Sequence, residues 1–345
     1  MTEATEFAAT LLERSASAYA AEAATTLAAD AGEEFDAWQQ HLTQRLFELA
    51  AAVANGEPEL FVARVRWSHK AFQARGRDTG RLLASLEALR DVLDRQLPPA
   101  AGRLPGEIIA AALTALRAPA PEAEQDGLDP ARAEDRLALN FLTLVLEGNV
   151  ADALAQIARA AETWPVEKLY LEVLMPAQRE IGTLWQLGDL SIPEEHLVTT
   201  TTERAMAILA HGAVRAPANG RTVLIAGVAG NVHQLGLRVA ADLFELAGWR
   251  ALLLGADIPA EELPVAIGFF GADLLILSAV LATQLRPLGD SIAAVRRECG
   301  DEVRILVGGS AFDDGREVWR RLGADGYAPT LGEATRLGAE LVGLN

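Results

Sequence analysis

Apolar residues recur at helical spacing through the first third of the chain. Leu82, Leu86, Leu89 and Leu93 follow one another at intervals of three or four residues. Side chains so spaced lie on one face of a helix, so residues 1–117 are predicted to form an all-helical domain. Residues 118–133 contain three prolines, a glycine and few residues that could pack, which is typical of a linker.

The helical period returns over residues 134–214, where it predicts a bundle of four or five helices of ten to fifteen residues. Helix-breaking residues interrupt the pattern at Gly148, Pro165, Pro176, Gly188 and Pro193.

The pattern changes in residues 220–345, where short apolar runs alternate with amphipathic stretches. The predicted strands are 222–228, 250–256, 273–279, 303–309 and a stretch around Tyr327. Continuous apolar strands separated by helices indicate a parallel sheet covered on both faces. The fold class is therefore multi-domain α and α/β, with a doubly wound C-terminal domain that follows a helical bundle.

Composition narrows the classes of function. Half of the residues are hydrophobic and the formal net charge is −18, which excludes a disordered polymer and disfavours binding to nucleic acid or anionic lipid. The single cysteine, Cys299, excludes an internal disulfide and a thiolate metal cluster. The N-terminus is acidic and no apolar run is long enough to span a membrane, so we expect a cytoplasmic protein.

Candidate site residues directly follow the predicted strands, at the edge where ligands bind open α/β sheets. The stretch after the first strand, GVAGNVHQLG, lacks the spacing of a dinucleotide fingerprint, which excludes a nucleotide-dependent oxidoreductase. It offers a histidine on a turn, facing a hydroxyl and a glycine pair from the later strands. These residues are Asn231, His233, Gly236, Ser278, Val280, Gly308 and Gly309.

Their joint spacing resembles the cobalamin-binding module of methionine synthases, mutases and corrinoid carriers. Forty-one residues separate Gly236 from Ser278, and twenty-seven separate Val280 from Gly308. The resemblance implies that His233 is the lower ligand of cobalt, that Ser278 bonds within the nucleotide-tail pocket and that the glycine pair lets the tail pass. Val280 replaces the usual leucine. Asn231 replaces an acid, so we expect a weaker bond between His233 and cobalt.

In the bundle, nine residues lie between Trp185 and the pair Glu195-His196. Residues 191–194, Ser-Ile-Pro-Glu, predict a capping box that places this pair at a helix N-terminus. Ahead of a cobalamin module the pattern resembles the motif of cobalamin photoreceptors, which include light-sensitive repressors. The resemblance implies that Trp185, Glu195 and His196 contact and shield an adenosyl group. Gln186 stands where the repressors have a histidine, so we expect water or His196 as the upper ligand after illumination.

The N-terminal domain differs from the basic DNA-binding domain of those repressors. Residues 1–60 hold eleven acids and two arginines, whereas residues 61–103 hold nine basic and four acidic residues. The basic stretch is either a solvated helix face that pairs with the acidic one or a pocket for a carboxylate-bearing ligand. The candidate pocket residues are Arg66, Trp67, His69, Lys70, Arg75 and Arg77.

The architecture resembles the photocobilins, photoreceptors with a globin-like helical domain that hold adenosylcobalamin and biliverdin. A bilin in this domain would be noncovalent, because Cys299 lies in the α/β domain. Haem is the alternative, with His41 or His69 as its ligand; either histidine could equally lie on the surface.

The sequence thus predicts a light sensor and not an enzyme, with light-dependent homodimer contacts or a downstream signalling protein as its output. A corrinoid protein that carries methyl groups between methyltransferases is the main alternative, and an α/β interaction module without a cofactor is a further one.

Overall fold

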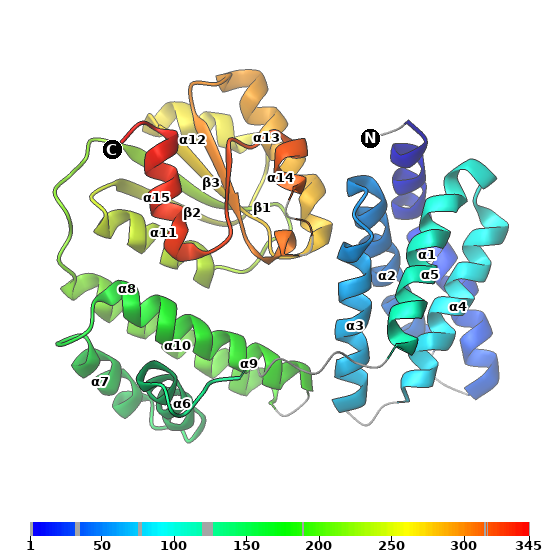
Figure 1. The fold of residues 1–345 in the computed structure, drawn as a ribbon, viewed down its shortest axis with the longest axis horizontal. Coiled ribbons are helices and arrows are strands. Elements are labelled where there is room, and N and C mark those ends of the chain that lie inside the picture. Colours follow the sequence, from blue (N-terminus) through cyan, green and yellow to red (C-terminus); the bar gives the residue numbers. More distant parts are fainter. Residues whose placement is uncertain are drawn as a thin grey trace. The chain divides into compact units, whose positions relative to one another are not determined.

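The computed structural model (Figure 1) describes residues 3–31, 35–74, 78–118, 127–187, 190–313, 315 and 317–344. The chain forms two compact units. The first contains Met1–Glu122 with the short segments Leu281–Arg286 and Ala311–Val318, and the second contains the rest.

Five helices make up most of the first unit. They are α1 (Glu3–Ala31), α2 (Phe35–Asn55), α3 (Glu59–Ala74), α4 (Thr79–Gln96) and α5 (Pro99–Arg117). The apolar residues of α4 at helical spacing, from Leu82 to Leu93, are buried as the pattern predicts. Asp78 caps α4 by accepting a hydrogen bond from the Gly80 amide at 2.8 Å.

The core of this unit also holds an ion pair within α2. Arg45 and Glu48 are 5% and 6% exposed, and their Nη1 and Oε2 atoms lie 2.9 Å apart. Burial raises the pKa of Glu48 and lowers the pKa of Arg45, since it disfavours both charged forms. The pair is therefore a polar element inside an otherwise apolar helix interface.

The second unit begins with a helical bundle. Its helices are α6 (Ala133–Leu146), α7 (Val150–Ala160), α8 (Val166–Leu169), α9 (Met175–Leu187) and α10 (Ile192–Gly212). Two expectations about length were wrong. Helix α10 has 21 residues, and α8 has four and continues through a π-helical turn, η1 (Tyr170–Leu174), into α9.

The predicted break at Pro176 is absent because of this π turn. The amide of Met175 donates to the carbonyl of Tyr170, five residues back, which widens the helix just before the proline. A proline within a regular helix clashes with the carbonyl four residues earlier, and the wider turn relieves that crowding. The chain therefore passes Pro176 in helical conformation.

A five-stranded parallel sheet completes this unit. Its order is β2-β1-β3-β4-β5, with β1 (Thr222–Val228), β2 (Arg250–Ile258), β3 (Leu274–Ser278), β4 (Arg304–Gly308) and β5 (Gly326–Ala328). All of β1 is buried, as its unbroken apolar run predicts. The order reverses beside β1, so the carboxyl ends of β1 and β3 border the crevice in which open α/β sheets bind ligands.

Helices cover both faces of this sheet, which confirms the predicted fold class. Helices α11 (Leu235–Leu246) and α15 (Leu331–Leu341) pack together on one face. Helices α12 (Glu262–Phe270), α13 (Leu285–Cys299) and α14 (Val318–Leu322) complete the crossovers (Figure 1). No helix in the described part of the chain is long and apolar enough to cross a membrane.

Candidate functional site

The loop between β1 and α11 is fixed by Asn231, whose side chain is fully buried. Its amide nitrogen donates to the carbonyl of Ser278 at the end of β3, at 2.9 Å. Its backbone amide donates to Val228 at 2.9 Å, and its carbonyl accepts from the amide of Asp257 at 3.0 Å. One asparagine therefore ties the loop to the ends of β1, β2 and β3.

His233 is exposed, and Asn231 orients it. The side-chain oxygen of Asn231 accepts from the His233 backbone amide at 3.1 Å and lies 3.1 Å from ring Nδ1. An amide oxygen can only accept, so this contact places the ring proton on Nδ1 and leaves a lone pair on Nε2. The neutral amide thus makes the contact that the resemblance assigns to an acid.

Asp257 contacts this loop, and no sequence pattern pointed to it. It is the last residue but one of β2 and has φ of 55°, which non-glycine residues rarely adopt, and its carboxylate accepts from the amide of Gly230 at 2.7 Å. Its position at the carboxyl end of a strand was the available signal, but an acid there is common. What distinguishes Asp257 is its positive φ and its bond to Gly230, and neither can be read from the sequence.

The ends of β3 and β4 meet where the spacing places them. Ser278 pairs with Gly308, and Gly309 has φ of +105°. A Cβ at Gly309 would lie 2.1 Å from the carbonyl oxygen of Ala279, so only glycine fits. At Gly236 a Cβ would meet no atom within 4 Å, which leaves open space at the start of α11.

In the bundle, the predicted capping box is present. The carboxylate of Glu194 accepts from the Ser191 amide at 2.7 Å and from its hydroxyl at 2.6 Å. These bonds lower the pKa of Glu194. They fix the start of α10, where Glu195 and His196 follow; Trp185, near the end of α9, is 39% exposed.

Glu195 holds the ring of His196, with its Oε2 2.6 Å from Nδ1. The His196 side chain is 72% exposed, so the held ring is accessible at the end of the bundle. Two further polar side chains contact Glu195 or its neighbours, Thr199 and Gln178. No sequence pattern pointed to these two residues, because their contacts with Glu195 depend on the packing of α9 against α10.

The bundle and the α/β domain share a core and a buried hydrogen bond. Val239 and Leu243 of α11 pack within the apolar cluster of the bundle. The Tyr170 hydroxyl, in the π turn, lies 2.7 Å from Asp242 Oδ2 and 3.0 Å from the Met206 carbonyl. Burial raises the pKa of Asp242, and burial together with the Asp242 carboxyl raises the pKa of Tyr170.

Arg66 and His69 of α3, two of the candidate bilin residues, line neither of the two pockets of the first unit that contain Glu13 or His41. Arg66 is exposed and pairs with Glu59 at 2.7 Å, and His69 is half-buried. The side chains of Trp67 and Lys70 and the whole of Arg75 and Arg77 lie outside the described residues.

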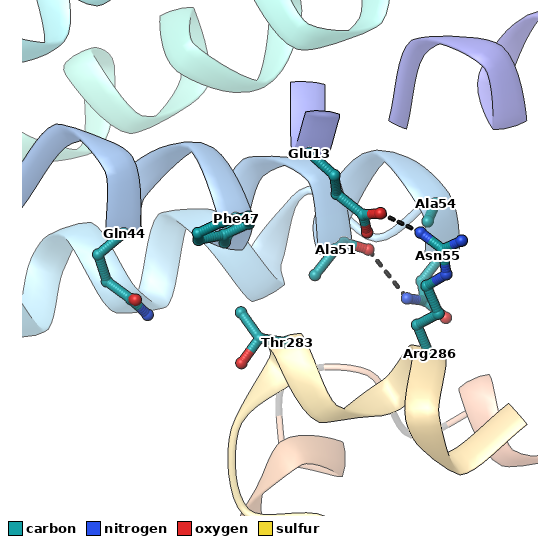
Figure 2. A pocket seen from close by; sticks show the side chains of 8 residues that line it. All are labelled: Glu13, Gln44, Phe47, Ala51, Ala54, Asn55, Thr283 and Arg286. Atoms are coloured by element: carbon teal, nitrogen blue, oxygen red, sulfur yellow. Dashed lines mark hydrogen bonds and ion pairs between the residues drawn. The ribbon is translucent and has the colours of Figure 1, made fainter. Parts of the chain in front are cut away.

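Two of the pockets lined by described residues lie in the first unit. The smaller, of about 180 Å³, is shown in Figure 2, where Glu13 of α1 forms an ion pair with Arg286. Its lining residues are Glu13, Gln44, Phe47, Ala51, Ala54, Asn55, Thr283 and Arg286. Ligand pockets usually exceed roughly 300 Å³, so this one is too small for a macrocycle. The other, of about 800 Å³, is lined in part by His41, whose ring lies 5.5 Å from Trp38 and 6.0 Å from Phe72.

Comparison with known proteins bears on the second unit. Two family models, each described as a B12 binding domain, match residues 138–210 and residues 221–336. The chain contains B12 binding domains. One match covers the bundle, and the other covers the sheet with the loop that carries His233.

Two kinds of relative match this B12-binding region. A corrinoid protein of Desulfitobacterium hafniense (strain Y51) is 29% identical over 170 residues, 47% of this chain and 77% of that protein. The HTH-type transcriptional repressor CarH of Myxococcus xanthus is 30% identical over 173 residues, 50% of this chain and 56% of the repressor. Among solved structures, the monomethylamine corrinoid protein of Methanosarcina barkeri shares the fold, with a TM-score of 0.54 and 19% identity over 61% of this chain and 100% of that one.

The residues fit a corrinoid. The ring of His233 stands at the carboxyl edge of the sheet with its proton held on Nδ1, which suits a single axial ligand to a metal held by a macrocycle. The open space beside Gly236 leaves room for part of such a molecule, and Gly308 and Gly309 at the end of β4 bring their backbone close to that of Ala328 and Ala279 with no side chain in between.

Proposed function

We propose that this chain is a light sensor that binds adenosylcobalamin between the bundle and the α/β domain. His233 would ligate the lower face of cobalt, while Trp185, Glu195 and His196 would cover the upper face. When bound, adenosylcobalamin supplies a cobalt–carbon bond that visible light breaks. Ser278, Val280, Gly308 and Gly309 would line the path of the nucleotide tail.

The observation that carries this proposal is the Glu195–His196 pair on an ordered helix start. A 2.6 Å contact fixes the pair, and the capping box fixes the turn that presents it. The pair and Trp185 resemble the motif of cobalamin photoreceptors, and the relatives include the repressor CarH. A carrier that must pass methyl groups to another enzyme needs an open upper face instead.

On this proposal the chain's own residues perform the response. Trp185 and His196 would pack against the adenosyl group in the dark and would lose that contact once the upper face is vacant. Because a ligand that favours one state biases a two-state element, this loss lets the bundle shift against α11. The expected outputs are altered homodimer contacts or a downstream protein in the cytoplasm, with no direct contact to nucleic acid or membrane.

We further propose that the first unit binds biliverdin as a second chromophore. The residues that favour it are Trp38, His41 and Phe72, whose rings lie together beside the larger pocket. Arg66 is less suited, because it pairs with Glu59. Haem remains the competing ligand for a site that contains His41.

A corrinoid carrier is the second candidate function. It is favoured by the relatives named corrinoid proteins, among them dimethylamine corrinoid protein 2 of Methanosarcina acetivorans, 26% identical over 196 residues. A carrier would prefer methylcobalamin and would depend on a methyltransferase partner.

The test is the double variant Trp185→Ala with His196→Ala, loaded with adenosylcobalamin in the dark. We expect the light-induced change in molecular size to disappear. His211→Ala is the matched control, because His211 is exposed at the far end of the same helix. A double variant that responds to light like the control would contradict the proposal.

A further inference from the structure

A chain of polar side chains leads from His196 into the interior of the bundle. His196 Nδ1 lies 2.6 Å from Glu195 Oε2, and Glu195 Oε1 accepts from the Thr199 hydroxyl at 2.8 Å. The Thr199 oxygen lies 3.2 Å from Gln178 Oε1, and Gln178 Nε2 lies 2.7 Å from the Thr202 oxygen. These polar side chains therefore link α10 to α9.

Helix geometry explains why these groups meet. Glu195, Thr199 and Thr202 are four and three residues apart, so they share one face of α10. Gln178 comes from α9. The inner end at Thr202 is fully buried, whereas the His196 side chain at the outer end is 72% exposed. An exposed ring is thus anchored to the bundle core.

The number of protons on each group fixes which side chain donates in each of these hydrogen bonds. A carboxylate only accepts, so Glu195 receives one proton from His196 Nδ1 and one from the Thr199 hydroxyl. Thr199 has a single proton, and it can contact Gln178 only by accepting. Turning the Gln178 amide over places its nitrogen toward Thr199 and its oxygen toward the Thr202 hydroxyl. Each hydroxyl and each amide group in the chain then has a complementary partner.

We infer that Thr199 and Gln178 are positioning residues that fix the Glu195 carboxylate, and that Glu195 in turn holds His196 with its proton on Nδ1. The Nε2 lone pair is then presented outward from the start of α10. The use of that lone pair rests on the proposed function: Nε2 is the atom that would meet the upper face of a corrinoid. Carboxylate–histidine pairs of this kind orient histidines that bind metals.

The first experiment needs no cofactor. Nitrogen-15 NMR of the full chain reports which ring nitrogen of His196 carries the proton, at a pH where the ring is neutral; His196→Ala assigns the signal. We expect the Nδ1 proton to predominate. A solvated histidine favours Nε2, so Thr199→Val and Gln178→Leu should shift the ratio toward Nε2 by several-fold.

Thr201→Val is the matched control. Thr201 lies on the same helix, but its hydroxyl donates to the Leu197 carbonyl at 2.7 Å. A wild-type ring protonated mainly on Nε2 would overturn the inference, as would equal tautomer ratios in the Thr199 and Thr201 variants.

A second readout separates this inference from the proposed function. The chain is loaded with hydroxocobalamin, and its absorbance is compared between wild type, His196→Ala and Thr199→Val. Shifted bands in both variants support ligation or contact by Nε2. If the Nδ1 tautomer is confirmed but the three spectra are identical, Thr199 and Gln178 still position His196. The claim that His196 Nε2 contacts the corrinoid is then overturned.

Discussion

At the residue scale, the side chain of Asn231 makes two contacts that shape the site. Its nitrogen ties the loop to β3, and its oxygen holds the ring of His233. An aspartate at this position could hold the ring but would turn a carboxylate oxygen toward the Ser278 carbonyl. The asparagine therefore fits the local hydrogen-bond pattern of this chain better than the acid usual in cobalamin modules.

We predict that Asn231→Ala weakens cobalamin binding by about 10- to 100-fold, because partners that orient a metal-binding histidine typically contribute that much. Equilibrium titration with hydroxocobalamin measures the change. Asn219→Ala is the control, since Asn219 accepts from the Arg221 amide at the opposite end of β1. Equal affinities in the two variants would show that His233 does not need its orienting partner.

The buried pair Arg45–Glu48 gives a second prediction at this scale. Arg45→Met leaves a buried carboxylate without its partner, which should cost about 3–5 kcal/mol of stability. Arg45→Met combined with Glu48→Leu removes both charges and should restore most of it. Urea unfolding followed by circular dichroism compares the variants; a double variant no more stable than the single one would contradict the expectation.

Among the elements, the strands were predictable and the π turn was not. Each strand is a short apolar run bounded by turn residues, and a buried parallel strand needs little else. The helix continues through Pro176 because a π turn precedes it, and Tyr170 of that turn contacts Asp242 of α11. A contact between helices so far apart in the sequence leaves no local pattern. The polar chain from Glu195 to Thr202 was hidden for a similar reason, because Gln178 reaches it from another helix.

The burial of Asp242 beside Tyr170 makes the stability of the second unit depend on pH, because burial raises the pKa of Asp242 by more than the Tyr170 hydrogen bond lowers it. The folded protein raises the pKa of Asp242 and so binds that proton more tightly than the unfolded chain. The free energy of unfolding should therefore fall as pH rises from the unfolded pKa through the folded one.

Thermal unfolding at a series of pH values checks this contribution. Asp242→Asn stays neutral throughout, so its stability should fall less with rising pH than that of the wild type. Asp290→Asn, an exposed acid on α13, is the control. Parallel curves for the wild type and the Asp242 variant would contradict the assignment.

At the scale of the whole molecule, the bundle shares its apolar core with α11, the helix that covers one face of the sheet. On the proposed function, a ligand above His233 would bias this packing. On the proposed function, the occupancy of the upper face, and not light itself, would set the quaternary structure. Sequence alone identified this architecture because three loops keep their spacing. For the first unit the sequence left biliverdin, haem or neither open, because the candidate residues there carry no comparable pattern.

We predict that two cobalamin forms give different assemblies in the dark. Analytical ultracentrifugation of the chain loaded with adenosylcobalamin and with hydroxocobalamin should show different sedimentation, because only the first fills the upper face. Equal sedimentation of the two forms would contradict a response driven by occupancy.

The most direct test of the account is an absorbance spectrum of the full chain, reconstituted in the dark with adenosylcobalamin and biliverdin, desalted, and measured again after green illumination. The account predicts cobalamin bands that are retained and shift on illumination, with an added far-red band where biliverdin is bound. Cobalamin bands that shift on illumination without a far-red band would show that the chain senses light through cobalamin and binds no biliverdin. A protein that prefers methylcobalamin and scarcely responds to light would contradict the account and identify a corrinoid carrier.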